Sequence, residues 1–140
     1  MRIITGAAKG RRLVAPDTDD TRPATDRVRE AVFSALGGWV VDADVLDLYA
    51  GSGSYGLEAL SRGAASATFV ESGRAAIEAL RTNIATVGLG GTVVATTVEA
   101  FLERSGDRRY HLVFIDPPWD LPTDAVDRQL GHIDDILASR

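Results

Sequence analysis

The string Asp116-Pro117-Pro118-Trp119 directly follows the apolar run from Leu112 to Ile115. Prolines lack an N–H, so they end a strand and hold an extended backbone whose carbonyls remain acceptors. Such acceptors suit an exocyclic amine on a planar base, which donates to Asp116 and the Pro117 carbonyl while Trp119 stacks on the ring. The string therefore favours a site for an amine-bearing base over a plain proline turn with a core tryptophan.

A glycine-rich loop, Asp47-Leu-Tyr-Ala-Gly51-Ser-Gly53-Ser-Tyr-Gly56, belongs to the apolar run that begins at Val45. Its glycines fit the pattern G-x-G-x-x-G, which lets backbone approach a ligand closely and lets a helix pack tightly on a strand. The glycine pattern alone is weak evidence for a ligand-binding loop. A strand before it and a helix after it favour a ligand-binding loop over a glycine-rich turn that binds nothing.

Two carboxylates indicate which cofactor this loop would hold. Glu71 ends the second apolar run, where it can accept hydrogen bonds from both hydroxyls of a ribose. Asp47 precedes the first glycine, and a carboxylate there repels a pyrophosphate but attracts an ammonium or sulfonium group. The pair therefore favours S-adenosylmethionine over a dinucleotide. In the alternative interpretation, Asp47 is hydrogen bonded to the amides of its own loop.

Apolar runs alternate with helical patterns from residue 45 onward. The runs cover 45–49, 67–70, 92–97 and 112–115, and the helical patterns cover 57–61, 74–87 and 98–104. This alternation predicts an α/β fold with a parallel sheet and helices on both faces. The glycine loop, Glu71 and Asp116 then lie together at the carboxyl ends of the strands, where such sheets bind ligands.

The N-terminal stretch is basic, whereas the remainder is acidic. Residues 1–29 hold seven basic and four acidic groups, although the net charge of the chain is −5. Two short apolar pieces around Gly6 and Gly10 predict a β-hairpin within residues 1–22, as an arm on a body of residues 23–140. A helix is predicted from a cap at Thr25 to Gly37-Gly38. A basic arm suits a phosphate backbone; the alternative is a solvated loop with scattered charges.

Length and composition exclude several classes of protein. A chain of 140 residues fits one domain, and the absence of cysteine excludes disulfides, thiolate metal sites and a cysteine nucleophile. We expect no metal. Residues 1–12 lack the apolar stretch of a secretory signal, and no run is apolar enough to span a bilayer, so we expect a cytoplasmic protein without a membrane partner.

The loop, Glu71 and Asp116 to Trp119 together resemble the Rossmann-like class I methyltransferases that methylate amino nitrogens through an (Asn/Asp)-Pro-Pro-(Tyr/Phe/Trp) motif. A narrower resemblance is to the RsmD-type bacterial 16S rRNA guanine-N2 methyltransferases. It rests on Arg2-Ile-Ile-Thr-Gly6, Lys9-Gly-Arg-Arg-Leu13, Thr21-Arg-Pro-Ala-Thr-Asp-Arg-Val-Arg-Glu30 and Asp47 to Gly63. This resemblance implies methyl transfer from S-adenosylmethionine to the N2 amine of a guanine, with 16S rRNA or the assembling small ribosomal subunit as partner.

The resemblance also implies roles for particular residues. The ribose of the cofactor would contact Glu71, and the adenine would contact Thr97 and Val98. The methionine end of the cofactor would contact Asp47, Tyr49, Ala50, Gly51, Ser52 and Gly53. The target base would contact Asp116, Pro117, Pro118 and Trp119, and RNA would contact Lys9, Arg11, Arg12, Arg22, Arg27 and Arg29. The sequence departs from the pattern of the resembled family at two places. Thr97-Val98 lacks the acidic or amide side chain that is usual at the adenine position, and Tyr55 places a bulky ring in a loop that normally carries small or aliphatic residues.

The reaction would be a direct displacement in which the amine attacks the sulfonium methyl. The absence of cysteine agrees with this, because methylation at carbon 5 of a pyrimidine usually needs a thiolate. Alternatives are an amino-methyltransferase acting on DNA adenine or protein glutamine, and an inactive cofactor-binding module. An NAD-dependent oxidoreductase is least favoured, because no hydride-transfer site is evident and Asp47 opposes a pyrophosphate.

The resemblance implies three more strands after residues 112–115, but only 21 residues follow Trp119. Val126, Leu130, Ile133 and Leu137 stand at helical spacing and predict one helix with these residues on its apolar face. We therefore expect a C-terminally truncated methyltransferase domain, about two thirds of the whole, with residues 112–115 as an apolar edge strand. A partner or the N-terminal hairpin could cover that edge.

Overall fold

The computed structural model describes residues 1–16, 26–118 and 120–138. Its elements are α1 (Asp26–Leu36), a 3-10 helix η1 (Gly37–Val40), β1 (Asp44–Leu48), α2 (Ser54–Ser61), β2 (Ser66–Glu71), α3 (Arg74–Val87), β3 (Thr92–Ala95), α4 (Val98–Glu103), β4 (Leu112–Ile115) and α5 (Thr123–Ile136). The predicted alternation is confirmed, and the bounds of α3 and β4 match the predicted ones. The predicted cap Thr25 lies outside the described residues.

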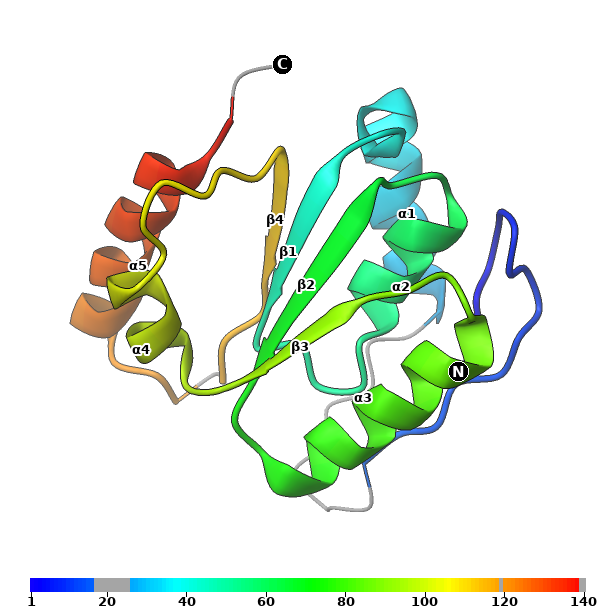
Figure 1. Ribbon diagram of the computed structural model, residues 1–140, viewed down its shortest axis with the longest axis horizontal. Helices are drawn as coiled ribbons and strands as arrows, with labels where there is room; N and C mark the ends of the chain where they lie inside the picture. Colours follow the sequence, from blue (N-terminus) through cyan, green and yellow to red (C-terminus); the bar gives the residue numbers. More distant parts are fainter. Residues whose placement is uncertain (17–25, 119, 139–140) are drawn as a thin grey trace.

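The four strands form one parallel sheet in the order β3-β2-β1-β4 (Figure 1). β1 lies between β2 and β4, so Asp47 pairs with Phe69 on one side and Phe114 on the other. In the same register Leu48 pairs with Ile115 and Glu71 with Ala95. All strands point the same way, and the loops after β1, β2, β3 and β4 therefore meet at one edge.

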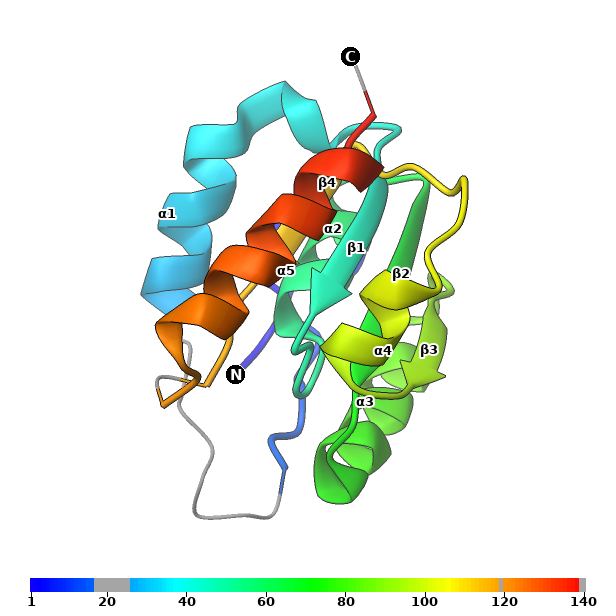
Figure 2. The ribbon, with the colours of Figure 1, turned by 90° about the vertical axis from the view of Figure 1, so that its left-hand side faces the viewer.

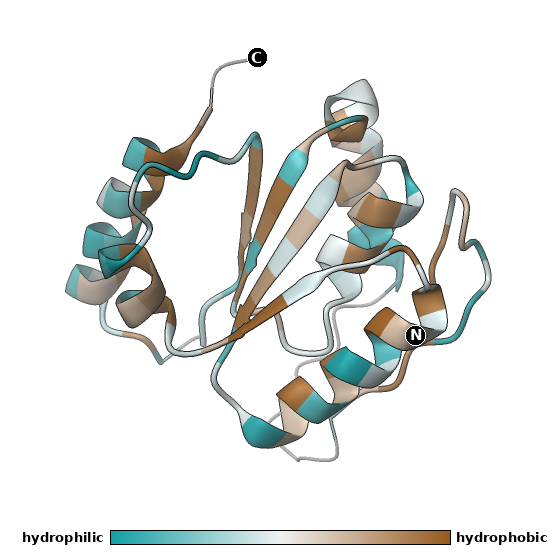
Figure 3. Ribbon diagram, viewed as in Figure 1, coloured by the Kyte–Doolittle hydropathy of each residue, from teal (hydrophilic) through white to brown (hydrophobic). Residues whose placement is uncertain are grey.

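Helices cover both faces of the sheet: α1, α2 and α3 lie on one face, and α4 and α5 on the other (Figures 1 and 2). Alternate residues of a strand point to opposite faces. Val45 and Phe69 accordingly belong to the apolar cluster under α1 to α3, whereas Leu46 and Val70 belong to the cluster under α4 and α5. Figure 3 shows the corresponding pattern, with hydrophobic strands between helices that have hydrophilic outer turns.

The predicted helix near the C-terminus is confirmed, and the face that it buries differs from the apolar stripe in the sequence. Leu130 and Leu137 are exposed, and the buried residues of α5 include Ala125, Gln129 and Ile133. Both stripes have helical spacing and share Ile133, but their centres differ by roughly a fifth of a turn about the helix axis. The packing of α5 on the sheet decides between them, and that packing buries a glutamine.

The N-terminal arm forms a short hairpin rather than two full strands. Arg2 pairs with Arg12 in an antiparallel bridge, and the Ile3 N–H donates to the Arg11 carbonyl at 2.9 Å. The arm lies against α2, where the fully buried Glu58 carboxylate accepts hydrogen bonds from the amides of Ile4 at 2.9 Å and Thr5 at 3.1 Å. It is therefore folded onto the body.

β4 is an edge strand, as predicted. The interpretation that the N-terminal hairpin covers this edge is wrong for the described residues, because the arm lies beside α2 and α3, away from β4 (Figure 1). The chain after α5 instead pairs at the start of the edge. The Tyr110 N–H donates to Ile136 O at 2.8 Å, and the Ala138 N–H donates to Tyr110 O at 2.7 Å. No helix in the described part of the chain is long and apolar enough to cross a membrane.

Candidate functional site

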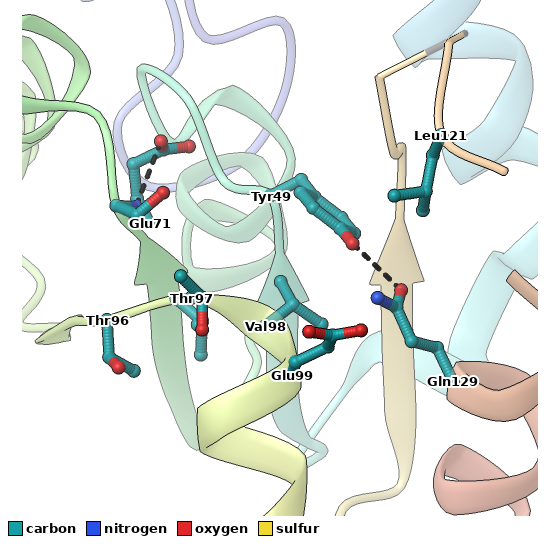
Figure 4. Close-up of a pocket in the computed structure, with 10 residues that line it drawn as sticks. Tyr49, Glu71, Thr96, Thr97, Val98, Glu99, Leu121 and Gln129 are labelled. Atoms are coloured by element: carbon teal, nitrogen blue, oxygen red, sulfur yellow. Dashed lines mark hydrogen bonds between the residues drawn. The ribbon is translucent and has the colours of Figure 1, made fainter. Parts of the chain in front are cut away.

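The predicted site residues gather at the carboxyl edge of the sheet. A cavity of about 230 Å³ opens there between the loops after β1, β2 and β3 and the helix α5 (Figure 4). Its walls are Tyr49, Val70, Glu71, Ser72, Thr96, Thr97, Val98, Glu99, Leu121 and Gln129. The structure thus brings together Tyr49, Glu71, Thr97 and Val98, four of the residues expected to contact the cofactor. Asp47 and residues 50–53 lie outside these walls.

The glycines of the loop have different roles. Gly51 has a φ of +59°, in the left-handed region, and a Cβ added there would meet nothing within 4 Å. A Cβ on Gly53 would lie 2.4 Å from Leu80 Cδ1, and one on Gly56 would lie 2.3 Å from Phe69 Cε1. The second and third glycines therefore allow α2 to pack closely against α3 and β2. Only Gly51 of these three faces open space, where backbone can approach a ligand.

Glu71 joins the loop after β1 to the turn after β2. Its Oε1 accepts a hydrogen bond from the Gly51 amide at 2.8 Å, and its Oε2 accepts from the amides of Gly73 at 2.8 Å and Ser72 at 3.1 Å. The same side chain lines the cavity. These amides set the orientation of the carboxylate at the position expected for a ribose, and its two oxygens together offer about four acceptor sites.

Asp47 is buried, with 4 % of its surface exposed, and its Oδ2 accepts a hydrogen bond from the Gly56 amide at 3.0 Å. Burial raises the pKa of Asp47 to about 8, against the smaller opposite effect of the Gly56 bond, and the charges of Glu71 and Asp116 raise it further. The bond to Gly56 gives Asp47 a structural role within its own loop. Contact with a cationic ligand stays a prediction.

Asp116 follows β4 directly and is exposed, and Pro117 beside it is partly buried. The Pro118 carbonyl accepts a hydrogen bond from the Leu121 amide at 3.0 Å, which closes a turn after the two prolines. The turn brings Leu121 to the wall of the cavity. Trp119 lies outside the described residues, so its stacking on a base stays a prediction.

The bulky ring of Tyr55, at the start of α2, packs against two phenylalanines. Its centroid lies 5.3 Å from that of Phe114 on β4 and 6.2 Å from that of Phe33 on α1. Burial raises the pKa of the Tyr55 phenol, and the neighbouring carboxyl of Asp116 raises it as well. Tyr55 therefore lies near Asp116, on the α1 to α3 face of the sheet.

Of the residues predicted to contact RNA, Lys9, Arg12 and Arg27 are exposed, and Arg22 lies outside the described residues. Arg11 is exposed too, but its guanidinium donates to the carbonyls of Thr86 and Val87 at 2.8 Å each, where α3 ends. The orphan carbonyls of a helix C-terminus attract such a cation. Arg11 therefore holds the arm on the body.

The prediction that Arg29 contacts RNA is wrong. Its side chain is fully buried and donates to Glu58 Oε1 at 3.4 Å, to Asp26 Oδ1 at 3.0 Å and to the Arg2 carbonyl. Arg27 and Arg29 are two residues apart on α1 and so lie on different faces of the helix, and Arg29 shares the buried face with Phe33. The difference arises because Arg29 faces the carboxylate of Glu58 across the helix pair α1 and α2.

Two buried amide side chains at the site were not predicted. Asn83 of α3 accepts from the Val14 amide at 2.8 Å and donates to the carbonyls of Val14 at 2.8 Å and Ser52 at 2.9 Å, so it joins the arm to the glycine loop. Gln129 of α5 accepts a hydrogen bond from the Tyr49 hydroxyl at 2.9 Å (Figure 4). A polar residue within the apolar stripe of a helix is the sequence signal that could have found both.

The chain matches the family model described as Conserved hypothetical protein 95 over residues 1–133. The chain belongs to this family. It is 48 % identical over 120 residues to the ribosomal RNA small subunit methyltransferase D of Escherichia coli strain K12, covering 85 % of this chain and 60 % of that protein. It is 38 % identical over 123 residues to a putative rRNA methyltransferase of Bacillus subtilis, covering 85 % of this chain and 67 % of that protein. Membership of this family confirms the resemblance to RsmD-type proteins.

Solved structures show the same fold. The putative methyltransferase yhhF of Escherichia coli superposes with a TM-score of 0.85 at 42 % identity, over 99 % of this chain and 75 % of that chain. A putative methyltransferase complexed with SAH superposes with a TM-score of 0.68 at 18 % identity, over 81 % of this chain and 32 % of that chain. The Rossmann-like class I fold is confirmed. This chain spans about 60 % of the length of the Escherichia coli relative.

Among the described residues, no three or more histidine and carboxylate side chains are grouped to hold a metal ion.

Proposed function

We propose that this chain contains the catalytic centre of a methyltransferase that transfers a methyl group from S-adenosylmethionine to the N2 amine of a guanine in 16S ribosomal RNA. The observation that carries the proposal is the meeting of two half-sites at one sheet edge. Tyr49 and Glu71 line the cavity, and Asp116-Pro117 directly follows β4, the strand beside β1. The names of the curated relatives, which are methyltransferases of ribosomal RNA, support the same function.

The cavity fits the adenosine end of the cofactor. Glu71 presents a carboxylate for the ribose hydroxyls, and Val70, Val98 and Leu121 offer apolar walls to a planar base. Gly51 faces open space next to Glu71 and leaves room for the methionine end. S-Adenosylmethionine, when bound there, supplies a sulfonium methyl group for transfer.

Asp116 and the Pro117 carbonyl would hold the acceptor amine. The exocyclic nitrogen of guanine is a weak nucleophile because its lone pair is delocalised into the ring. Hydrogen bonds from the amine to the Asp116 carboxylate and the Pro117 carbonyl orient it and stabilise the positive charge that develops on nitrogen. Because Leu48 pairs with Ile115, Asp116 follows β4 beside the loop that starts at Tyr49, next to the cofactor site.

The basic arm would hold the RNA. Lys9 and Arg12 are exposed on the arm, and Arg27 is exposed on α1. Exposed cations bind phosphates without sequence preference and position the substrate, whereas contacts at the base select it. The arm is fixed to α2 through Glu58, so its charges have a defined place relative to the sheet edge.

The test is to incubate the 140-residue chain with methyl-labelled S-adenosylmethionine and with unmethylated 16S RNA, assembled 30S particles, DNA and protein in parallel. We expect label in N2-methylguanine from RNA or from 30S particles. Label in DNA or protein alone would contradict the substrate. Binding of S-adenosylhomocysteine with no transfer to any acceptor would instead identify a cofactor-binding but inactive module, which the open edge of β4 favours as the second candidate.

A further inference from the structure

We propose that Gln129 determines the specificity of the cofactor cavity for adenine, by donating a hydrogen bond from its amide nitrogen to a ring nitrogen of the base. Tyr49 orients this amide. The inference rests on the proposed function and deepens it, because it assigns to α5 a contact that the loop after β3 lacks. Thr97-Val98 carries no acidic or amide side chain, and Gln129 supplies an amide from another element of the cavity wall.

The carboxamide of Gln129 is buried and held in one orientation. Gln129 is 3 % exposed, and its Oε1 accepts a hydrogen bond from the Tyr49 hydroxyl at 2.9 Å. The carbonyl oxygen is therefore occupied, and the two N–H donors point away from Tyr49. Figure 4 shows the amide nitrogen on the side of Val98 and Glu99, toward the cavity. Within the described part of the chain, the bond from Tyr49 is the one hydrogen bond that this side chain makes.

Tyr49 is kept in an unusual backbone conformation that supports this arrangement. Its φ is +55°, in the left-handed region that favours glycine over a bulky aromatic residue. The next amide, of Ala50, donates to the Val70 carbonyl at 3.0 Å and so fixes the chain as it leaves β1. Backbone conformations of this kind persist where the surrounding structure imposes them, and they concentrate at ligand sites. Here the conformation brings the phenol to Gln129 of α5.

The arrangement suits adenine in particular. The cavity has a carboxylate, Glu71, at the ribose position and apolar side chains of Val70, Val98 and Leu121 for the faces of a planar ring. An adenine ring carries three nitrogens that accept hydrogen bonds, and a fixed N–H donor recognises one of them. A buried donor without an acceptor is penalised, which makes a polar contact of this kind selective.

The test measures binding of S-adenosylhomocysteine and of its 1-deaza, 3-deaza and 7-deaza analogues by titration calorimetry. Each analogue replaces one ring nitrogen by C–H. We expect the wild-type chain to bind one of the three about tenfold more weakly than S-adenosylhomocysteine, as the removal of a single buried hydrogen bond predicts. Gln129→Leu should bind S-adenosylhomocysteine about tenfold more weakly and should no longer discriminate against that analogue.

Two further variants separate recognition from structure. Gln129→Glu keeps the size of the side chain and an acceptor for Tyr49 but removes the N–H donors, so it should lose the same discrimination even if Gln129→Leu fails to fold. Tyr49→Phe keeps the donors but removes the bond that orients them, and it should weaken the discrimination in part. The matched control is Leu130→Ala, next to Gln129 but exposed, which should bind all four ligands as the wild type does.

The outcomes distinguish this inference from the proposed function. If the wild-type chain binds no S-adenosylhomocysteine, the proposed function fails. If it binds, and Gln129→Glu discriminates among the analogues as the wild type does, the function stands and the role of Gln129 is overturned. An equal loss of affinity for all four ligands in Gln129→Glu would also overturn it, since it would show that Gln129 only supports the cavity wall.

Discussion

Arg29 of α1 and Glu58 of α2 form an ion pair in which both side chains are fully buried, with Arg29 Nε 3.4 Å from Glu58 Oε1. Glu58 also accepts hydrogen bonds from Arg62 Nε at 2.8 Å and from two amides of the arm. One carboxylate therefore holds together α1, α2 and the N-terminal arm. The helix α2 begins directly after the glycine loop, so this ion pair also supports the base of the cofactor site.

Glu58→Gln should lower the free energy of unfolding by about 3 to 5 kcal/mol, because it removes the one fully buried carboxylate that faces the buried charge of Arg29 and leaves it only the half-exposed Asp26. Urea denaturation followed by circular dichroism measures the change. Glu78→Gln, at an exposed position of α3, is the matched control and should change the stability by less than about 0.5 kcal/mol. Equal stability of the two variants would show that the buried pair contributes little.

The burial of Asp47 should make stability depend on pH. Its pKa rises from 3.8 to about 8 in the folded chain, so between these values the folded state keeps a proton that the unfolded state has released. Stability should therefore fall as the pH rises from about 4 to about 8. Asp47→Asn keeps an oxygen for the Gly56 amide and has no charge to bury, so it should be more stable than the wild type near pH 8.

Urea denaturation at intervals between about pH 4.5 and pH 9, a window that brackets the folded pKa, measures this effect. The control is Asp124→Asn, whose side chain is 77 % exposed, and it should follow the wild-type profile. Parallel pH profiles for wild type and Asp47→Asn would show that Asp47 is ionised in the folded chain, against the raised pKa.

The exposed cations of the arm should account for part of the salt dependence of RNA binding. Replacing Lys9 and Arg12 by Ala together should weaken binding and reduce the slope of log affinity against log salt by about 2, one for each phosphate that is no longer neutralised. Fluorescence anisotropy with an RNA oligonucleotide at several salt concentrations measures the slope. Arg104→Ala, exposed at the end of α4 on the other face of the sheet, is the control.

Arg11 should behave differently from Arg12. Its guanidinium caps α3 through the carbonyls of Thr86 and Val87, so Arg11→Ala should reduce stability by roughly 0.3 to 1 kcal/mol as well as RNA affinity. Arg12→Ala should reduce the affinity for RNA without changing the stability of the chain. Thermal denaturation beside the anisotropy assay separates the two effects, and equal melting temperatures would remove the structural role of Arg11.

Asp116→Ala should abolish methyl transfer and leave the affinity for S-adenosylhomocysteine within about twofold of the wild type, because Asp116 is not part of the cavity wall. Filter assays of label transfer and calorimetry measure the two quantities. Glu71→Ala, in contrast to Asp116→Ala, should lose affinity for S-adenosylhomocysteine, because Glu71 lines the cavity. Loss of cofactor binding in Asp116→Ala would show that the acceptor and cofactor sites are not divided as proposed.

Local chemistry explains which elements could be predicted. Residues 74–87 form a helix because apolar residues recur at helical spacing and Gly88 ends it in the left-handed conformation, with a φ of +73°. Residues 112–115 form a strand because an apolar run stops at two prolines. Both signals lie within the segment that they shape, so no knowledge of distant residues is needed.

The errors have the opposite origin. Arg29 is buried because Glu58, distant in the sequence, meets it between two helices. The buried face of α5 includes Gln129 because the hydroxyl of Tyr49 satisfies its carbonyl. In both cases a polar side chain is buried because a distant partner satisfies it, and hydrophobic periodicity carries no information about such partners.

The parallel α/β architecture, the glycine loop and the proline-ended fourth strand follow from the amino-acid sequence alone, because these depend on spacing and on turn-forming residues within short segments. Which charged and amide side chains support the body, and which can meet a ligand, depends on how the elements pack. Burial depends on what packs against a residue, and for Arg29, Glu58, Asn83 and Gln129 the packing partner comes from a separate element of the fold.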